Sequence, residues 1–372
     1  MTRRILVRVT LALAVLTLLL FSSAPVAAHE EKTNGYFSLL DPAGNVVFQT
    51  ALQVSLGDEF IAEDNSHYRV VRLEGDKAQC EYLGKASLAT TDEAQRPSWL
   101  SGLLFFVSRP VSAVQGKTVA LYHTHSDESY VPSDGSASIY AHGGIFKVGN
   151  AMTATLRKLG LSVIHSTRSH DPHDAMAYTR SRRTAAELLR RRPAALFDVH
   201  RDSVPREQYT AQVKGEDVTK VTLVVGRENP KIKANLNFAK QLKEINDKEN
   251  PGLVKGIFLA RGGYNQDLFD RALLLEVGTH ENSRTAAERG ASLFADSVPR
   301  AIGAAGTPAR TQPGPVTQRT GSWSALGWTL LLLILGGAAY LYLGTGSWGE
   351  VKRKLQRFTG SEFSSFLGRK KK

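Results

Sequence analysis

The sequence predicts an α/β protein with a mostly parallel sheet covered by helices, preceded by a small β-rich domain and followed by one transmembrane helix. Three observations indicate this architecture. Residues 116–303 alternate short apolar runs with longer amphipathic runs, as strands and helices do around a parallel sheet. Residues 30–112 hold short alternating runs separated by turn residues. Residues 325–343 are apolar and carry no charge, and they are long enough to cross a bilayer core of about 30 Å.

Composition narrows the class of protein. The chain has 372 residues, of which 42% are hydrophobic and 22% charged, as is typical of a globular protein. Its formal net charge is +12, but the excess lies mainly in the first eight residues and after residue 349, so we expect no nucleic-acid partner. Cys80 is the only cysteine, which excludes an intrachain disulfide and a thiolate metal cluster.

The N-terminus has the pattern of a secretory leader. Arg3 and Arg4 precede a mostly apolar run from Val9 to Phe21, and small residues follow up to Ala28. This pattern predicts a signal peptide over residues 1–28, with an uncleaved membrane anchor as the alternative.

The β-rich domain is expected over residues 30–112. Its predicted strands cover residues 37–40, 46–48, 60–61, 68–73 and 78–83, with turn signals between them. No catalytic pattern occurs there, so we expect a module used for packing or partner binding.

The catalytic domain is expected over residues 115–303. Strands are predicted at residues 118–122, 161–164, 194–198, 221–225, 256–260 and 272–275. Helices are predicted at residues 148–159, 175–191, 231–248 and 284–298.

The C-terminal part predicts a membrane topology. Residues 304–322 are rich in Gly, Pro, Thr and Gln and predict a linker. The apolar stretch 325–343 is flanked by tryptophan and tyrosine, and the basic tail 344–372 follows it. Positive charge collects on the cytoplasmic side, so we expect a single-pass cell-membrane protein with an extracytoplasmic catalytic domain and a cytoplasmic tail.

Candidate site residues follow three predicted strands at the point where each strand ends. The carboxyl ends of strands in an open α/β sheet border the crevice where ligands bind. Imidazole and carboxylate groups are zinc ligands, and a catalytic zinc keeps one position for a water whose pKa it lowers to about 7. The pattern predicts a Zn²⁺ hydrolase with a glutamate as general base. The residues are His123, His125 and Glu128 after the first strand, His200 after the second, and Glu276 after the third.

Three stretches closely resemble the stage II sporulation protein P family. The resemblance covers roughly residues 115–303 and implies a zinc-dependent N-acetylmuramoyl-L-alanine amidase acting on peptidoglycan, with endopeptidase activity on stem-peptide crosslinks also ascribed to the family. It further implies septal wall remodelling during sporulation engulfment, beside a lytic transglycosylase and other engulfment proteins. The stretches are His123-Thr124-His125-Ser126-Asp127-Glu128-Ser129-Tyr130, Asp198-Val199-His200-Arg201-Asp202-Ser203 and Leu275-Glu276-Val277-Gly278.

The resemblance also implies residue roles. His200 matches the later histidine ligand of the broader amidase pattern, and Glu276 matches its catalytic base. The helix start at residues 146–148 holds no acid, so Glu128 is the expected second ligand. Either His123 or His125 supplies the first ligand, and the spacing from the strand end favours His125.

The remaining polar residues are given supporting roles. Arg201 and Asp202 are expected to orient His200 or to contact the substrate peptide, and Asn282 lies in the loop after Glu276. His142, His165, His170, His173 and His280 are interpreted as surface or supporting residues.

Two other hypotheses stay open. The missing acid at the helix start is compatible with a catalytically degenerate wall-binding or scaffold subunit. A metallopeptidase that cuts only stem-peptide crosslinks would use the same site.

Overall fold

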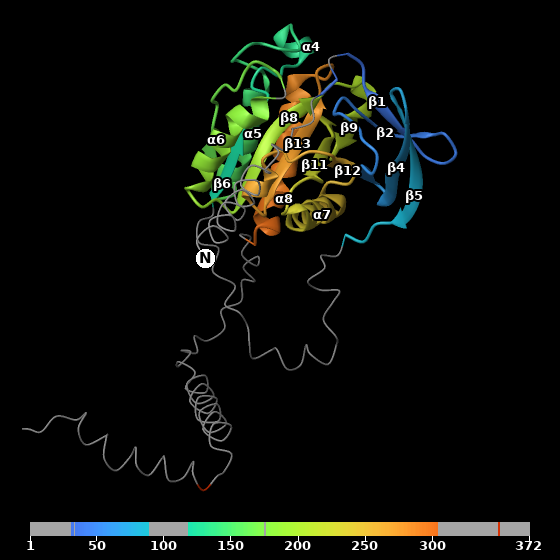
Figure 1. Ribbon diagram of the computed structural model, residues 1–372. Helices are drawn as coiled ribbons and strands as arrows, with labels where there is room; N and C mark the ends of the chain where they lie inside the picture. Colours follow the sequence, from blue (N-terminus) through green and yellow to red (C-terminus); the bar gives the residue numbers. More distant parts are fainter. Residues whose placement is uncertain (1–30, 33, 89–117, 175, 304–348, 350–372) are drawn as a thin grey trace, which may run out of the picture. The chain divides into compact units, whose positions relative to one another are not determined.

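One large sheet organises the chain. The computed structural model describes residues 31–32, 34–88, 118–174, 176–303 and 349. Eleven strands form a single sheet in the order β2-β1-β5-β4-β3-β12-β11-β13-β8-β6-β7 (Figure 1). A separate hairpin pairs β9 (Thr210–Val213) with β10 (Glu216–Thr219).

The strands of the α/β part do not all run in the same direction. β7, β6, β8 and β13 are parallel neighbours, whereas β11 is antiparallel to β13 and parallel to β12. The α/β part is therefore parallel except between β11 and β13, but the complete sheet, with its antiparallel N-terminal strands, is mixed and not mostly parallel as predicted. A buried apolar run reads the same whichever way the strand points, so the sequence pattern did not reveal the reversal at β11. These strands are β6 (Thr118–Tyr122), β7 (Ser162–His165), β8 (Ala195–Asp202), β11 (Val221–Gly226), β12 (Val254–Ala260) and β13 (Ala272–Thr279).

The N-terminal strands continue the same sheet. β3 pairs antiparallel with β12, so that Phe60 lies opposite Phe258. The small β-rich domain expected ahead of the α/β domain is therefore, in its described part, one edge of the large sheet. These strands are β1 (Phe37–Leu40), β2 (Val46–Thr50), β3 (Glu59–Ala62), β4 (Ser66–Glu74) and β5 (Lys77–Lys85).

Helices cover both faces of the α/β part. The helices α5 (Ile145–Lys158), α7 (Ile232–Glu249) and α8 (Arg284–Ala301) pack on one face, and α6 (Ala177–Leu189) packs on the other (Figure 1). Alternate residues of β6 serve the two layers, because successive side chains of a strand point to opposite faces. Leu121 joins the core under α5, α7 and α8, and Ala120 joins the core under α6.

The helix sequences account for this packing. In α5, Ile145, Val148, Met152 and Leu156 are buried, and their spacing of three or four residues makes one apolar stripe. α8 begins after Ser283, whose side chain accepts a hydrogen bond from the Ala286 N–H, as an N-cap residue does.

The expected membrane topology is corrected. No helix of the described residues is both long and apolar enough to cross a membrane. The longest helices there, α7 and α8, have 18 residues each and are amphipathic, with charged side chains on their exposed faces. The described part of the chain therefore gives no support to the expected transmembrane helix or to the single-pass membrane location. The segments predicted as leader (1–28), linker (304–322) and membrane span (325–343), and all of the predicted tail except Gly349, lie outside the described residues.

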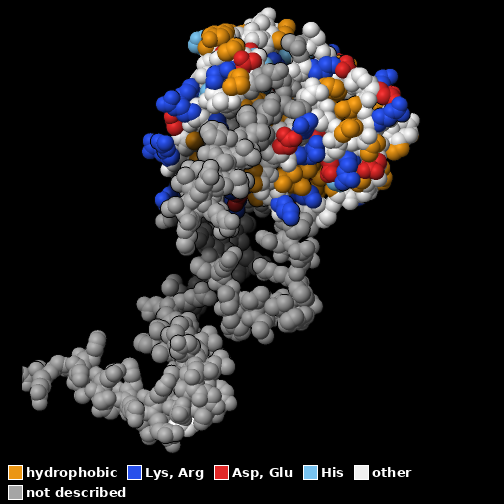
Figure 2. All heavy atoms as spheres, viewed as in Figure 1, with side chains coloured by type: hydrophobic (Ala, Val, Ile, Leu, Met, Phe, Trp, Pro, Cys, Tyr) orange, Lys and Arg blue, Asp and Glu red, His pale blue; other side chains and the backbone are white. Residues whose placement is uncertain are grey.

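Surface charge is mixed on the face drawn in Figure 2. Lys and Arg side chains are interspersed with Asp and Glu side chains over the described part of that face.

Candidate metal centre

The loop after β6 is buried along its whole length. Every residue from His123 to Tyr130 is at most 4% exposed. Backbone N–H groups of the following segment hold it in place: the Gly143 N–H donates to Ser126 O at 3.0 Å, and the Ile145 N–H donates to Glu128 O at 3.0 Å. A Cβ atom at Gly143 would lie 2.4 Å from Glu128 O, so only glycine permits this close approach.

Glu128 joins two of the predicted ligands. Its Oε1 lies 3.2 Å from His200 Nδ1 and 3.3 Å from His125 Nδ1. Its Oε2 accepts a hydrogen bond from the Arg201 backbone N–H at 2.9 Å. The carboxylate is fully buried. Burial opposes its ionisation, but the positive charge of His200 and the hydrogen bond from His125 outweigh burial and hold the pKa of Glu128 well below its ordinary value.

Asp198 orients His200. Both residues lie on β8, and Asp198 Oδ1 is 2.9 Å from His200 Nε2. Burial disfavours the charged imidazole, but Asp198 and Glu128 together raise the pKa of His200 well above its ordinary value. Asp198 also accepts hydrogen bonds from the backbone N–H and the hydroxyl of Thr124, so it ties the loop after β6 to β8. A carboxylate on the far nitrogen of a histidine is the usual support of a metal ligand.

Glu276 is a buried carboxyl with no hydrogen-bond partner for either oxygen among the described residues. It lies on β13 opposite His200 of β8, and it is 1% exposed. Burial, with Asp202 nearby, raises the pKa of Glu276 well above its ordinary value. Such a group is costly to bury unless it has a ligand or a chemical role.

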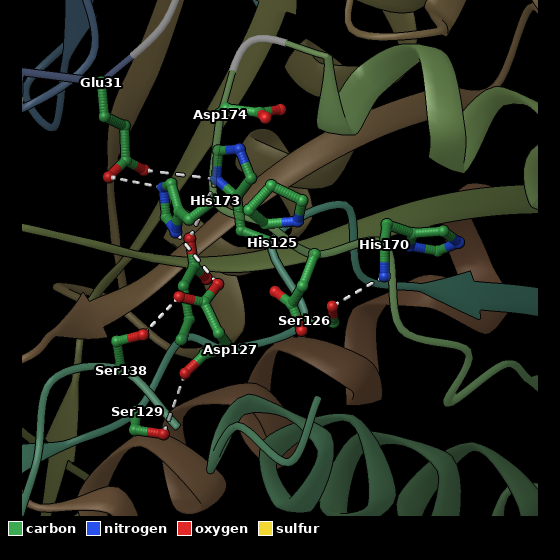
Figure 3. Close-up of polar contacts among 12 residues, drawn as sticks. Glu31, His125, Ser126, Asp127, Ser129, Ser138, His170, His173 and Asp174 are labelled. Carbon is green, nitrogen blue, oxygen red and sulfur yellow. Dashed lines mark hydrogen bonds and ion pairs between the residues drawn. The ribbon is translucent and has the colours of Figure 1, made fainter. Parts of the chain in front are cut away.

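Two residues that the sequence analysis did not select as ligands complete the group. The ring of His173 stacks on that of His125 with centroids 3.8 Å apart, and its Nδ1 lies 3.0 Å from Asp127 Oδ1. The carboxylate of Glu31 lies 3.8 Å from His125 Nδ1 and 3.7 Å from His173 Nε2 (Figure 3). Ligand atoms of Glu31, His125, Glu128 and His173 all lie within 4.8 Å of one another. Neither Glu31 nor His173 lies in a run with strand or helix periodicity, so the only available signal was their residue type.

His123 makes its contacts outside this group. Its Nδ1 is 2.8 Å from Val199 O, and its Nε2 is 2.7 Å from His165 Nε2. Burial, with His165 adding to it, lowers the pKa of His123 to about 3. Of the two histidines left open by the sequence, His125 is the one that contacts Glu128.

The expected supporting residues differ in position. Arg201 is 5% exposed, its Nη2 donates to Ala137 O at 3.1 Å, and its Nε and Nη1 have no hydrogen-bond partner among the described residues. Asp202 accepts hydrogen bonds from the Ala51 N–H at 2.8 Å and from the Tyr209 hydroxyl at 3.0 Å, so it holds the end of β2 against β8. Asn282 accepts from the Thr279 N–H at 2.9 Å and shapes the turn after β13.

The donor atoms fit a divalent metal. Imidazole nitrogens with carboxylate oxygens suit zinc and neighbouring first-row ions. His125 Nδ1 faces the carboxylates of Glu128 and Glu31 at 3.3 and 3.8 Å, so in its neutral form it would direct a lone pair at an ion held between them.

An α/β protein with a buried histidine–carboxylate centre at the ends of β6 and β8 is the class that the fold and the site define. Residues 61–298 match the family "Stage II sporulation protein P (SpoIIP)", and this chain belongs to that family. It is 31% identical over 199 residues to stage II sporulation protein P of Bacillus subtilis (strain 168). That match covers 48% of this chain and 50% of the relative, so the chain spans about half the length of the relative.

Solved structures with a similar arrangement include two amidases. The N-acetylmuramyl-L-alanine amidase Ami1 from Mycobacterium smegmatis is 14% identical, with a TM-score of 0.36, over 52% of this chain and 99% of that one. The CwlD amidase from Clostridioides difficile, solved in complex with the GerS lipoprotein, is 14% identical, with a TM-score of 0.33, over 50% and 99%. At these scores the likeness does not define the chemistry of the site.

Proposed function

We propose that this chain is a zinc-dependent peptidoglycan hydrolase of sporulation that cleaves the N-acetylmuramoyl-L-alanine amide bond, with stem-peptide crosslinks as a second substrate. The observation that carries the proposal is the buried carboxyl of Glu276, which has no hydrogen-bond partner among the described residues and lies opposite His200. His200 in turn contacts Glu128. Family membership supports peptidoglycan as the substrate. A lytic transglycosylase and other engulfment proteins are the proposed partners.

His125, Glu128 and His200 would hold the metal. When bound, zinc would supply a water of lowered pKa and would polarise the scissile carbonyl. Glu276 would accept the proton of the attacking water and return it to the leaving amide nitrogen. Its raised pKa suits a group that has to hold that proton between the two transfers. Asp198 would keep His200 in one ring orientation through the contact at 2.9 Å.

Product analysis of the full chain tests the proposal. Peptidoglycan is digested with the purified protein, and the products are identified by mass spectrometry, while bound zinc is measured by elemental analysis. We expect free stem peptides and one zinc per chain, and both should be lost in His200→Ala. His67→Ala is the matched control, because His67 contacts Glu59 on the neighbouring strand and lies outside the centre.

The alternatives give different results in the same experiment. Cut crosslinks without free stem peptides identify a metallopeptidase. A folded chain that binds peptidoglycan, contains no zinc and releases no product identifies a scaffold subunit and refutes the proposal.

A further inference from the structure

We propose that Glu31 is a built-in carboxylate ligand of the metal centre and keeps the centre closed until the N-terminal segment, residues 31–32, is displaced. The inference rests on the proposed function, because it concerns the same metal centre. It adds a ligand from outside the three stretches that carry the family resemblance, and it assigns that ligand a regulatory role.

Distances place the Glu31 carboxylate among the ligand atoms. Its side chain is 9% exposed although it lies at the beginning of the described residues, and its two oxygens face His125 and His173 at 3.8 and 3.7 Å (Figure 3). Two ligand atoms bound to one tetrahedral zinc at about 2.0–2.2 Å are roughly 3.3–3.6 Å apart. The spacings are too long for direct hydrogen bonds and close to those that a shared ion needs.

Glu31 and a substrate cannot use this position together. A water or carbonyl oxygen that reaches an ion held by His125 and Glu128 has to lie beside the same two ligand atoms. The carboxylate of Glu31 already lies there, within 4.8 Å of both. Catalytic zinc keeps one open position, whereas structural zinc has four protein ligands. Glu31 and His173 lie beside His125 and Glu128, and these four groups together would give the closed form.

Among the described residues, the contacts of the N-terminal segment outside the centre are two to the chain after β2 and two of the Lys32 side chain, one of which is with the Phe37 ring at 4.8 Å. The Lys32 N–H donates to Ala51 O at 2.8 Å, and Glu31 forms an isolated bridge with Leu52. The Lys32 side chain pairs with Asp76, which is 59% exposed, and an exposed pair contributes little. Withdrawal of the segment therefore leaves the strands of the sheet intact.

Arg201 indicates what replaces Glu31. Its Nη1 lies 3.8 Å from Glu31 Oε2, and the Nε and Nη1 of this buried guanidinium have no hydrogen-bond partner among the described residues. A carboxylate of an incoming peptide would take the place of the Glu31 carboxylate, because a guanidinium binds carboxylates through paired hydrogen bonds. The N-terminal segment and a carboxylate-bearing peptide then compete for one position.

Cobalt(II) and azide provide a test on the full chain. Cobalt replaces zinc and reports its coordination by visible absorption, and azide is a small anion that binds only at an open position. We expect azide to change the spectrum of Glu31→Gln and Glu31→Ala at about tenfold lower concentration than that of the native chain. Both variants should also hydrolyse peptidoglycan faster. Glu74→Gln is the matched control, because Glu74 is 48% exposed and pairs only with Arg72 among the described residues.

The experiment distinguishes failure of the Glu31 inference from failure of the proposed function. If the native chain binds cobalt and responds to azide in the same way as Glu31→Gln, Glu31 is not a ligand and this inference is overturned, while the metal centre stands. If the folded native chain binds neither cobalt nor zinc, the proposed function itself fails.

Discussion

Replacement of Glu276 by glutamine should stabilise the metal-free protein and abolish hydrolysis. The glutamine has the same shape but cannot ionise. In the folded chain the pKa of Glu276 is raised by burial and by Asp202 nearby, whereas in the unfolded chain it is close to 4.3. At pH values between these two pKa values, Glu276 has lost its proton in the unfolded state but retains it in the folded state. The free energy of unfolding therefore falls as the pH rises through this interval.

The magnitude follows from linkage. Each pH unit of the interval costs the native chain about 1.4 kcal/mol. Glu276→Gln removes this cost, and its advantage over the native chain should be absent near pH 4 and should grow toward neutral pH. A change of 1 kcal/mol corresponds to about 2–4 °C in Tm for a domain of this size. For catalysis, loss of a general base costs about 10²–10⁴ in rate.

Thermal unfolding at several pH values, with a chelator present, measures the stability difference, and release of stem peptides measures the activity. Glu207→Gln is the control, since Glu207 is 70% exposed and should change neither quantity. A stability difference that does not depend on pH would contradict the burial argument. Activity close to that of the native chain would refute the role of Glu276 as the base.

Three further variants test other contacts. Asp198→Asn should weaken zinc binding about 10–100-fold in chelator competition, because His200 loses its charged partner at 2.9 Å; unchanged affinity would contradict this. Burial lowers the pKa of Lys255 to about 7, so between about pH 7 and 10 the unfolded state holds a proton that the folded state lacks, and native stability should rise by about 1.4 kcal/mol per pH unit. Lys255→Met should flatten that slope in urea unfolding. Gly149→Ala should destabilise by roughly 1–3 kcal/mol, because its Cβ would lie 2.7 Å from His123 Nε2; an unchanged midpoint of urea unfolding would show that the ring can move.

Local patterns predicted the elements well because each depends on neighbours in the sequence. The apolar runs at residues 118–122 and 272–275 became β6 and β13, and the amphipathic run at 284–298 lies within α8. The directions of the strands could not be predicted from these local patterns, because they are set by the hairpin β9–β10 and by pairing between distant segments. Burial on both faces gives parallel and antiparallel strands the same apolar composition.

The candidate site was predictable where a strand end brings its residues together. His125, Glu128 and His200 were selected for that reason, and the structure places them in contact through Glu128. Glu31 and His173 were missed because they come from segments with no regular pattern and are brought there by tertiary folding. His123 also follows the end of β6, two residues before His125. Its ring contacts His165 and not the metal-ligand group.

The antiparallel pairing of β3 with β12 has a consequence for any shortened version of the chain. Along Val254–Ala260 every residue is buried, and one side of this strand is satisfied by β3, with Ile257 opposite Ile61. A fragment beginning near residue 115 would expose the unpaired backbone of β12 as a flat apolar edge, which is a template for intermolecular β-pairing. The N-terminal strands thus cover the edge of β12 and protect the part of the protein that carries His125 and His200 from aggregation.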